Sequence, residues 1–154
     1  MIGRMKPLIA LSVVLPLLLS CAVASAAPAE ACLPEFRDGW IRLPANAAMP
    51  MAAGFGRFSN GCGGALEVRA VSSAAFGDVS LHETTQVGGV SRMREVEALP
   101  LPAGGDVVLQ PGGLHLMLMQ PAQPLHEGER LPLVFGLRDG REIQAELEVR
   151  KAAP

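Results

Sequence analysis

Tyrosine is absent from this chain of 154 residues, and tryptophan occurs once. Basic residues are in slight deficit, with 13 Lys and Arg against 15 Asp and Glu, so no basic face for nucleic acid is expected. We can place neither a Ser-His-Asp arrangement nor a pair of carboxylates suited to acid–base chemistry, and the sequence therefore does not indicate an enzyme. The length suits one domain, and the mild acidity is compatible with a cationic ligand.

Long apolar runs are also missing, except at the N-terminus, where one follows the basic residues Arg4 and Lys6. This run is short for a membrane span and leads into small residues. Ala24-Ser25-Ala26 fits the cleavage pattern of a secretory signal peptide. We therefore expect residues 1–26 to be removed and residues 27–154 to form a single exported domain.

A second processing route stays open at the same end of the chain. Leu18-Leu19-Ser20-Cys21 is similar to a lipobox, the signal of bacterial lipoproteins. Along this route Cys21 would be lipidated and become the first residue of a membrane-anchored protein.

Two cysteines remain in the predicted exported domain, Cys32 and Cys62. An isolated pair in an exported chain is typical of a disulfide, which here would close a loop of about thirty residues. A thiol metal site or a redox pair is the alternative, although the spacing is far from Cys-x-x-Cys.

Helical periodicity is absent from the exported part, where short β-rich runs alternate with glycine and proline signals. Runs at this spacing predict an all-β domain, a sandwich or a barrel. Leu99–Pro102 is rich in proline and is expected to be a loop or an edge. The nine predicted strands are Gly39–Leu43, Ala53–Ser59, Leu66–Ser72, Asp78–Gln86, Val90–Glu97, Asp106–Gln110, Leu114–Gln120, Leu131–Arg138 and Arg141–Arg150.

The last two strands illustrate how burial fixes the pairing. Their apolar residues alternate, and the two sets share a face only if Phe135 pairs with Ile143. That pairing requires a three-residue loop, Arg138-Asp139-Gly140, with Gly140 in the left-handed conformation.

Histidine and methionine occur together in two of the predicted strands. In Leu114–Met119 the leucines take one face, and His115, Met117 and Met119 take the other. His115 and Met117 can therefore bind one ion from the same side of the strand.

A second pair lies upstream, on either side of Gly88-Gly89. A two-residue turn there pairs Thr84 with Met93 and His82 with Glu95. His82 and Met93 then lie diagonally on one face, at a backbone separation of about 7–8 Å that long side chains can span. A shift by one residue would put them on opposite faces.

The types of these four residues predict the metal. Thioethers are soft, neutral donors that suit copper(I), and imidazole suits copper as well. Zinc does not normally use methionine, and a blue-copper centre needs a cysteine beside its histidines. Methionine is also an ordinary core residue, so the pattern alone leaves a purely structural role open. We assign no role to Met119 or to Met49 and Met51, and we expect His126 to be a solvated loop residue.

The spacing of the four residues resembles a known signature. His82, Met93, His115 and Met117 match the H-x10-M-x21-H-x-M pattern of the periplasmic copper chaperones called PCuAC, and the surrounding block from Gly112 to Met119 is similar too. Glu83 stands where that family often has a second methionine.

The resemblance implies a cupredoxin-like or immunoglobulin-like antiparallel β-sandwich with Greek-key connections. It implies one solvent-accessible Cu(I) held by the two His and two Met, and a periplasmic protein that is not an enzyme. It implies delivery to the CuA site in subunit II of cytochrome c oxidase, directly or with a Sco-type copper protein. General copper buffering or tolerance, and a metal-free structural sandwich, are the alternatives.

Overall fold

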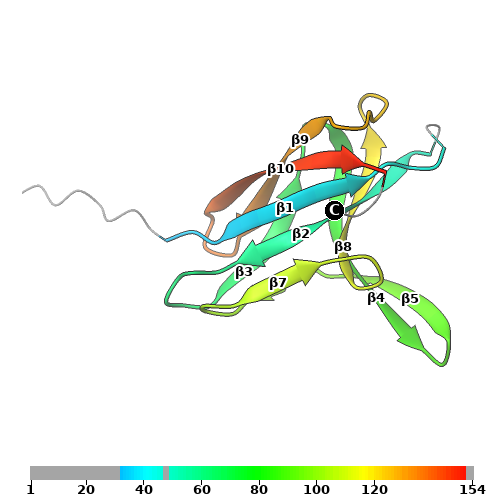
Figure 1. The fold of residues 1–154 in the computed structure, drawn as a ribbon. Coiled ribbons are helices and arrows are strands. Elements are labelled where there is room, and N and C mark those ends of the chain that lie inside the picture. Colours follow the sequence, from blue (N-terminus) through cyan, green and yellow to red (C-terminus); the bar gives the residue numbers. More distant parts are fainter. Residues whose placement is uncertain (1–31, 47–48, 152–154) are drawn as a thin grey trace, which may run out of the picture. The chain divides into compact units, whose positions relative to one another are not determined.

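Ten strands and no helix are found in the part of the chain that the structure describes, residues 32–46 and 49–151 of a computed structural model (Figure 1). The predicted leader, residues 1–26, and Cys21 lie outside this part. No element within it is a helix long and apolar enough to cross a membrane. The strands are β1 (Glu35–Arg42), β2 (Met51–Ser59), β3 (Leu66–Ser72), β4 (Phe76–Val87), β5 (Val90–Glu95), β6 (Leu99–Leu101), β7 (Asp106–Leu109), β8 (Leu114–Pro121), β9 (Arg130–Leu137) and β10 (Glu142–Arg150).

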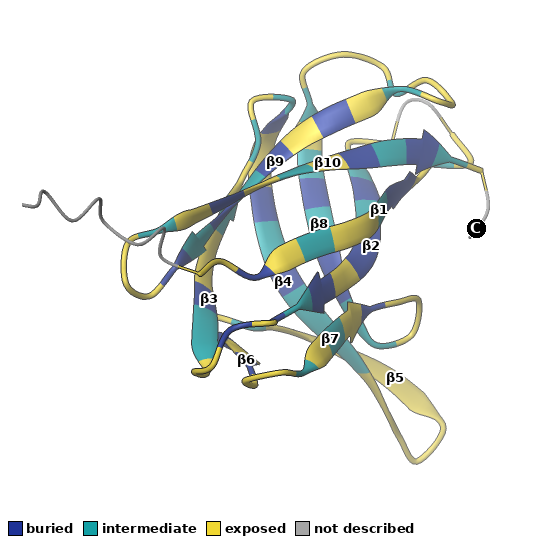
Figure 2. Cartoon of the chain, turned by 60° about the vertical axis from the view of Figure 1, so that its left-hand side comes forward, coloured by how far each residue is buried: buried dark blue, intermediate teal, exposed yellow. Residues whose placement is uncertain are grey.

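These strands join in one sheet that folds back on itself as a sandwich (Figures 1 and 2). The order is β5-β4-β8-β2-β1-β10-β9-β3-β6, and β7 pairs with β2. Strands β1 and β10 run parallel, whereas the other pairs are antiparallel. Because β3 also contacts β4, the sheet encloses a single core. The expected all-β antiparallel sandwich is confirmed.

The core takes alternate residues of each strand. On β8, Leu116 and Leu118 are fully buried, whereas Met117 between them is half-buried on the outer face. The rings of Phe58 and Phe135 meet inside the sandwich with their centroids 4.8 Å apart. Each such buried side chain contributes about 1.5–3 kcal/mol, so the inner face is what stabilises the fold.

Strand β1 begins earlier than predicted, at Glu35 instead of Gly39. Its pairing with β2 shifts register between Arg37 and Trp40, and Asp38 in the shifted stretch has a positive φ of 54°. A β-bulge of this kind breaks the alternation of side chains, which concealed the first half of the strand from sequence reasoning.

The proline-rich stretch forms β6, a short strand at the edge of the sheet. It pairs only with β3 in the described part of the chain, with Pro100 opposite Glu67. Proline is tolerated at an edge because its missing N–H need not join a ladder. Of the two expected alternatives, loop or edge, the edge is correct.

Both predicted hairpin registers are confirmed. Phe135 pairs with Ile143, and Gly140 in the loop has a φ of 87°. At the other hairpin, Val87 pairs with Val90 across Gly88-Gly89. The two glycines have φ angles of 59° and 77°, the left-handed values that a two-residue hairpin turn requires.

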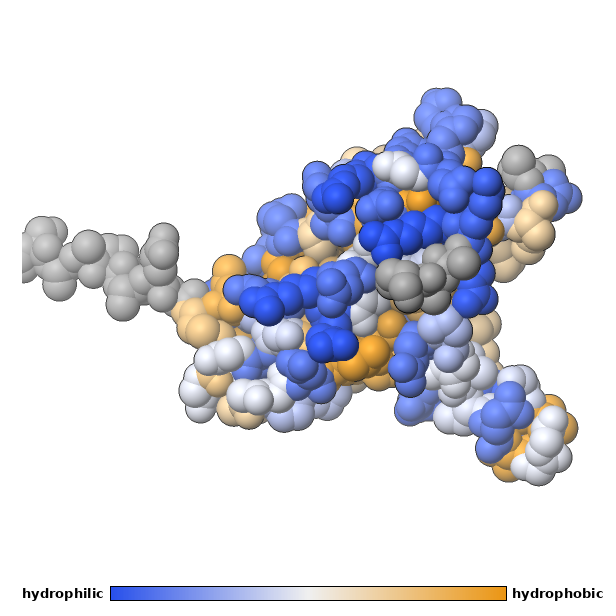
Figure 3. All heavy atoms as spheres, in the orientation of Figure 1, coloured by the Kyte–Doolittle hydropathy of each residue, from blue (hydrophilic) through white to orange (hydrophobic). Residues whose placement is uncertain are grey.

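The β4–β5 hairpin extends away from the rest of the sandwich (Figure 1). All residues of β5 are exposed, and Val87 and Val90 at the tip are 57% and 58% exposed. Figure 3 shows the resulting apolar surface at the end of the hairpin. Strand β5 thus contributes little to the core, and among the described strands it pairs with β4 alone.

Strand β2 changes partner along its length. Its first half, from Met51 to Gly54, pairs with β8, and its second half, from Gly56 to Ser59, pairs with β7. Strand β8 therefore has β2 beside it at Met117 but not in register at His115. The sheet opens on that side of His115.

Cys32 and Cys62 form a disulfide, as predicted. The bond ties the segment before β1 to the loop after β2. Neither sulfur is then available as a thiolate, so the alternative of a thiol metal site at this pair is wrong.

Candidate metal centre

The pairing of β4 with β8 places the two histidines of the strands side by side. His82 lies directly opposite His115 in the register, and directly opposed side chains share a face of the sheet. The centroids of their rings are 6.0 Å apart. Two imidazoles that are 33 positions apart in sequence thus meet on the outer face because two non-consecutive strands pair.

His115 is held by its own backbone. Its side chain is 7% exposed, and its Nδ1 lies 2.9 Å from the carbonyl oxygen of Gly113. A carbonyl only accepts, so Nδ1 carries the proton and donates it there. The other nitrogen, Nε2, then has a free lone pair, which is the arrangement usual for a metal-binding histidine.

Met93 meets that lone pair from β5. The Sδ atom of Met93 lies 3.3 Å from Nε2 of His115. Both atoms carry lone pairs and neither carries a proton in this tautomer, so the contact is not an ordinary hydrogen bond. Metal bonds of about 2.0 Å to nitrogen and about 2.3 Å to sulfur, the values known for zinc, put two donors about 3.3–3.5 Å apart at ordinary bond angles.

His82 has one partnered and one unpartnered nitrogen. Its Nε2 lies 3.0 Å from Oγ of Ser80, two residues earlier on the same face of β4. Within the described part of the chain, its Nδ1 is buried and has no hydrogen-bond partner. A buried polar atom left unsatisfied costs about 1–3 kcal/mol, and a bound cation would remove that cost.

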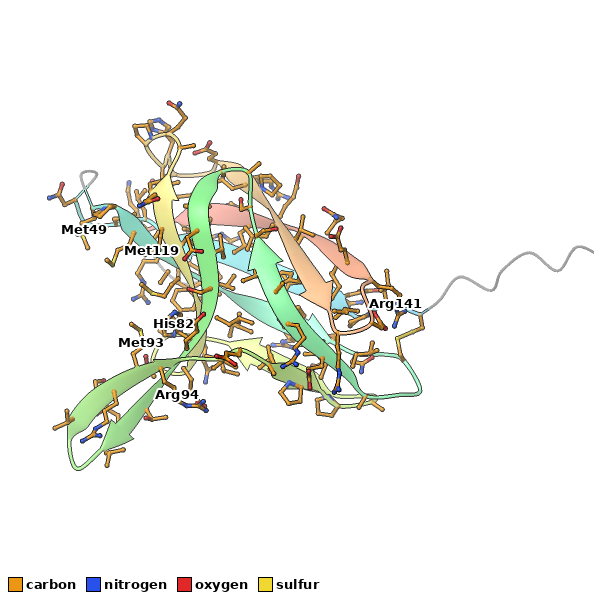
Figure 4. The ribbon with its side chains drawn as sticks, turned by 180° about the vertical axis from the view of Figure 1, so that it is seen from behind. Met49, His82, Met93, Arg94, Met119 and Arg141 are labelled. Carbon is orange, nitrogen blue, oxygen red and sulfur yellow. A yellow bond between two sulfur atoms is a disulfide. The ribbon has the colours of Figure 1, made fainter. Side chains whose placement is uncertain are left out.

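Met117 follows on β8, two residues after His115 and on the same face. It pairs with Ser80 on β4 and is half-buried. The structure therefore brings His82, Met93 and His115 into one group, with Met117 at the adjoining position. Figure 4 shows His82 and Met93 at the base of the hairpin.

Charges around the group are few. Glu95 lies opposite His82 on the same face and is exposed, so a carboxylate is available to attract a cation. Glu83 points to the other face, where Arg94 donates to it at 2.5 Å. Glu83 is thus engaged in an ion pair and does not reach the histidines.

Among the described residues, His, Cys, Asp and Glu side chains alone do not form a metal site. In residues 32–46 and 49–151, no group of three or more His, Cys, Asp or Glu side chains could hold a metal ion. His126 is exposed in the loop after β8, as expected.

Two groups that hydrogen-bond the histidine rings were not predicted from the sequence: the hydroxyl of Ser80 and the carbonyl of Gly113. Ser80 could have been found, because it lies two residues before His82 and so shares its face. The carbonyl of Gly113 gives no signal in the sequence, since any residue carries one.

Comparison with known proteins gives a family and a set of similar folds. Residues 35–149 match the family described as "Putative lipoprotein LpqE-like". A "Putative lipoprotein Lxx21020" of Leifsonia xyli subsp. xyli is 36% identical over 108 residues, which cover 69% of this chain and 63% of that protein. The match thus spans less than two thirds of that relative's length.

Solved structures share the fold. The solution structure of CuI-DR1885 from Deinococcus radiodurans has 25% identity and a TM-score of 0.60, covering 84% of this chain and 83% of that one. The apo PCuAC domain from PmoF1 and the copper-bound PCuAC domain from PmoF2 are each 19% identical, with TM-scores of 0.62 and 0.61. Each covers 76% of this chain and 92% of its own, and the cupredoxin-like sandwich expected from the sequence is thereby confirmed.

The family match extends from the first residue of β1 to the last residue but one of β10 and so includes every residue of the candidate centre. The chain belongs to the LpqE-like family.

Proposed function

We propose that this protein binds one copper(I) ion through His82, Met93, His115 and Met117 and carries it to a partner. The observation that carries the proposal is the 3.3 Å approach of Met93 Sδ to the unprotonated Nε2 of His115. His82, whose ring centroid lies 6.0 Å from that of His115, has an Nδ1 that is unpartnered among the described residues and supplies a further imidazole to the proposed centre. Four neutral, soft donors favour a monovalent soft ion over zinc, calcium or magnesium.

The relatives support copper as the cargo. Two of the structures that share the fold are described as copper-loaded, CuI-DR1885 and the PmoF2 domain. The resemblance to the PCuAC copper chaperones points to a carrier, which needs an ion that a partner can reach. Met93 is 53% exposed, so one donor of the proposed centre faces solvent. These points favour a carrier over an enzyme.

Location and recipient form the finer part of the proposal. Both the family and the Leifsonia relative are described as lipoproteins, which supports export and favours lipidation at Cys21 over cleavage after Ala26. The proposed recipient is the CuA site of cytochrome c oxidase, reached directly or through a Sco-type protein, in the periplasm. General copper buffering remains the competing role for the same centre.

The first test replaces Met93 by leucine, which keeps the size of the side chain and removes the sulfur. We expect the copper(I) dissociation constant to rise by at least about tenfold. Mutating residues that only hydrogen-bond to a metal ligand already weakens metal affinity by about 10–100-fold. The measurement is a competition titration of the reduced metal against a copper(I) chelator.

Val90→Leu is the matched control, because it lies on the same strand and is similarly exposed. It should leave the dissociation constant unchanged. A Met93→Leu variant that binds as tightly as wild type would contradict the proposed centre. A melting temperature indifferent to copper(I) in the wild type would favour the metal-free sandwich, because a ligand of the folded state must raise it.

A further inference from the structure

Four methionines gather beside the candidate centre, and the proposed function uses only one of them. We call Met49, Met51, Met117 and Met119 the methionine cluster. Met51 on β2 lies directly opposite Met119 on β8, and Ala53 lies opposite Met117. Met51 is therefore a direct neighbour of Met119 and a diagonal neighbour of Met117 on the same face.

The cluster borders a cavity. Met49, Met51 and Met117 line a hollow of about 760 Å³ together with Ala53. Because the side chain of Ala53 is only a methyl group, the space opposite Met117 is open to the side chains of Met49 and Met51. Figure 4 shows Met49 and Met119 on the side of the molecule that carries His82 and Met93.

These methionines do not serve as core filling. The inner face of the same two strands is occupied by residues such as Leu116 and Leu118, which are fully buried. The five methionines of the described residues all lie outside the core, three half-buried and two exposed. Methionines collected on an outer face are typical of binding surfaces, so the cluster is a candidate for binding a ligand.

We propose that Met51, Met117 and Met119 form a second site for a soft monovalent cation, Cu(I) or its analogue Ag(I). Three neutral thioethers provide soft donors without negative charge, which suits such an ion and excludes hard divalent ones. Direct and diagonal positions on paired strands bring long side chains within reach of one point.

Charge around the cluster is compatible with a cation. Asp78 on β4 lies opposite Met119 and places a carboxylate beside the site. Two basic residues also line the cavity, but both are engaged. The guanidinium of Arg42 lies over the rings of Trp40 and Phe55, at 5.8 and 5.3 Å, and the ammonium of Lys151 pairs with Glu127 at 2.6 Å.

Met117 would connect the two sites. This connection rests on the proposed function, because Met117 is both a proposed donor of the first centre and a diagonal neighbour of Met51. An ion could then pass between the first centre and the cluster while it stays bound to Met117. The second site, with no imidazole, is expected to bind more weakly than the first.

The test follows the methionine methyl groups by NMR in the full chain, labelled with carbon-13 at the methionine methyls. Silver(I) nitrate is the probe, added in chloride-free buffer, and each signal is assigned from its Met→Leu variant. We expect the first equivalent to shift Met93 and Met117. The second equivalent should shift Met51 and Met119.

The variants separate a shared site from single sulfurs that bind alone. In Met51→Leu, the Met119 signal should need at least tenfold more silver for the same shift. Met49→Leu is the matched control, because it lines the same cavity but is outside the proposed ligand set, and it should leave that shift unchanged.

Two results would overturn the second site. One is a pair of Met51 and Met119 signals that stay unmoved through three equivalents of silver. The other is a Met119 shift that is the same in Met51→Leu as in wild type. If Met51 and Met119 move while Met93 does not, the second site stands and the first centre fails.

Discussion

At the scale of single residues, local hydrogen bonds set the chemistry of the candidate centre. The bond from His115 Nδ1 to the carbonyl of Gly113 leaves Nε2 free to face Met93. The hydroxyl of Ser80 likewise holds the ring of His82, through a hydrogen bond at Nε2. These contacts fix the orientation of the rings before any ion arrives, so little side-chain entropy remains to be lost on binding.

A residue-scale prediction concerns Asp139, in the loop between β9 and β10. Hydrogen bonds from Arg141, both side chain and backbone, lower the pKa of this carboxyl below its ordinary value of 3.8. Because the pKa of Asp139 is lower in the folded than in the unfolded protein, its charged form stabilises the fold when the pH is above the unfolded pKa. That contribution is lost as the pH falls through the lowered folded pKa.

Asp139→Asn should therefore be slightly less stable than wild type at neutral pH. The difference should shrink once the pH falls below 3.8 and vanish only below the lowered folded pKa. The effect is small, because the group is fully exposed. Urea unfolding of both proteins across this pH range measures it. A difference that grows on acidification would contradict the assignment.

At the scale of elements, the alternation of side chains on β5 decides which residues face the histidines. Met93 pairs with Thr84 on the site's face, whereas Arg94 pairs with Glu83 on the other. The two-residue turn at Gly88-Gly89 fixes this arrangement by setting the register of the hairpin.

Exchanging Met93 and Arg94 tests this alternation while keeping the composition constant. In the variant Met93→Arg/Arg94→Met, we expect copper(I) affinity to fall as far as in Met93→Leu, because the sulfur then points away from His115. The exposed pair of Arg94 with Glu83 is lost too, but surface ion pairs contribute only about 0–1 kcal/mol. Competition titration and thermal melting measure the two effects. Full affinity in the exchanged variant would show that the hairpin rearranges freely.

The pairing of the strands shows which parts of the fold could be predicted from the sequence and which could not. Hairpin registers were predictable, because burial and turn length constrain neighbouring strands. The pairing of β4 with β8 was not, since His82 and His115 belong to strands that no short turn connects. Their meeting depends on the whole sheet order, which propensity and alternation do not encode. The bulge at Asp38 and the strand β6 were not predictable either. The bulge interrupts the alternation of side chains, and β6, with three residues, is too short to show one.

At the scale of the whole molecule, the disulfide and the candidate centre occupy different elements. Cys32 and Cys62 tie the start of the domain to the loop after β2, whereas the proposed donors lie on β4, β5 and β8. The disulfide should therefore stabilise the fold without shaping the centre.

Replacing both cysteines by serine should lower the free energy of unfolding by about 2–4 kcal/mol, as for other native disulfides that close loops of this length. Copper(I) affinity of the folded protein should stay within twofold of wild type. Chemical denaturation and competition titration check the two expectations. Loss of copper binding in a variant that remains folded would show that the bond positions the centre.

The exposed β4–β5 hairpin has a kinetic consequence. Within the described part of the chain, β5 has a single hydrogen-bonded neighbour and no buried residue, so it can separate from β4 at a lower free energy than global unfolding requires. His82, His115 and Met117 lie on strands paired on both sides or packed on the core, so they would stay in place while Met93 departs. For the proposed centre, the residence time of an ion would then be set by this local opening, and an incoming donor from another protein could take the position that Met93 vacates.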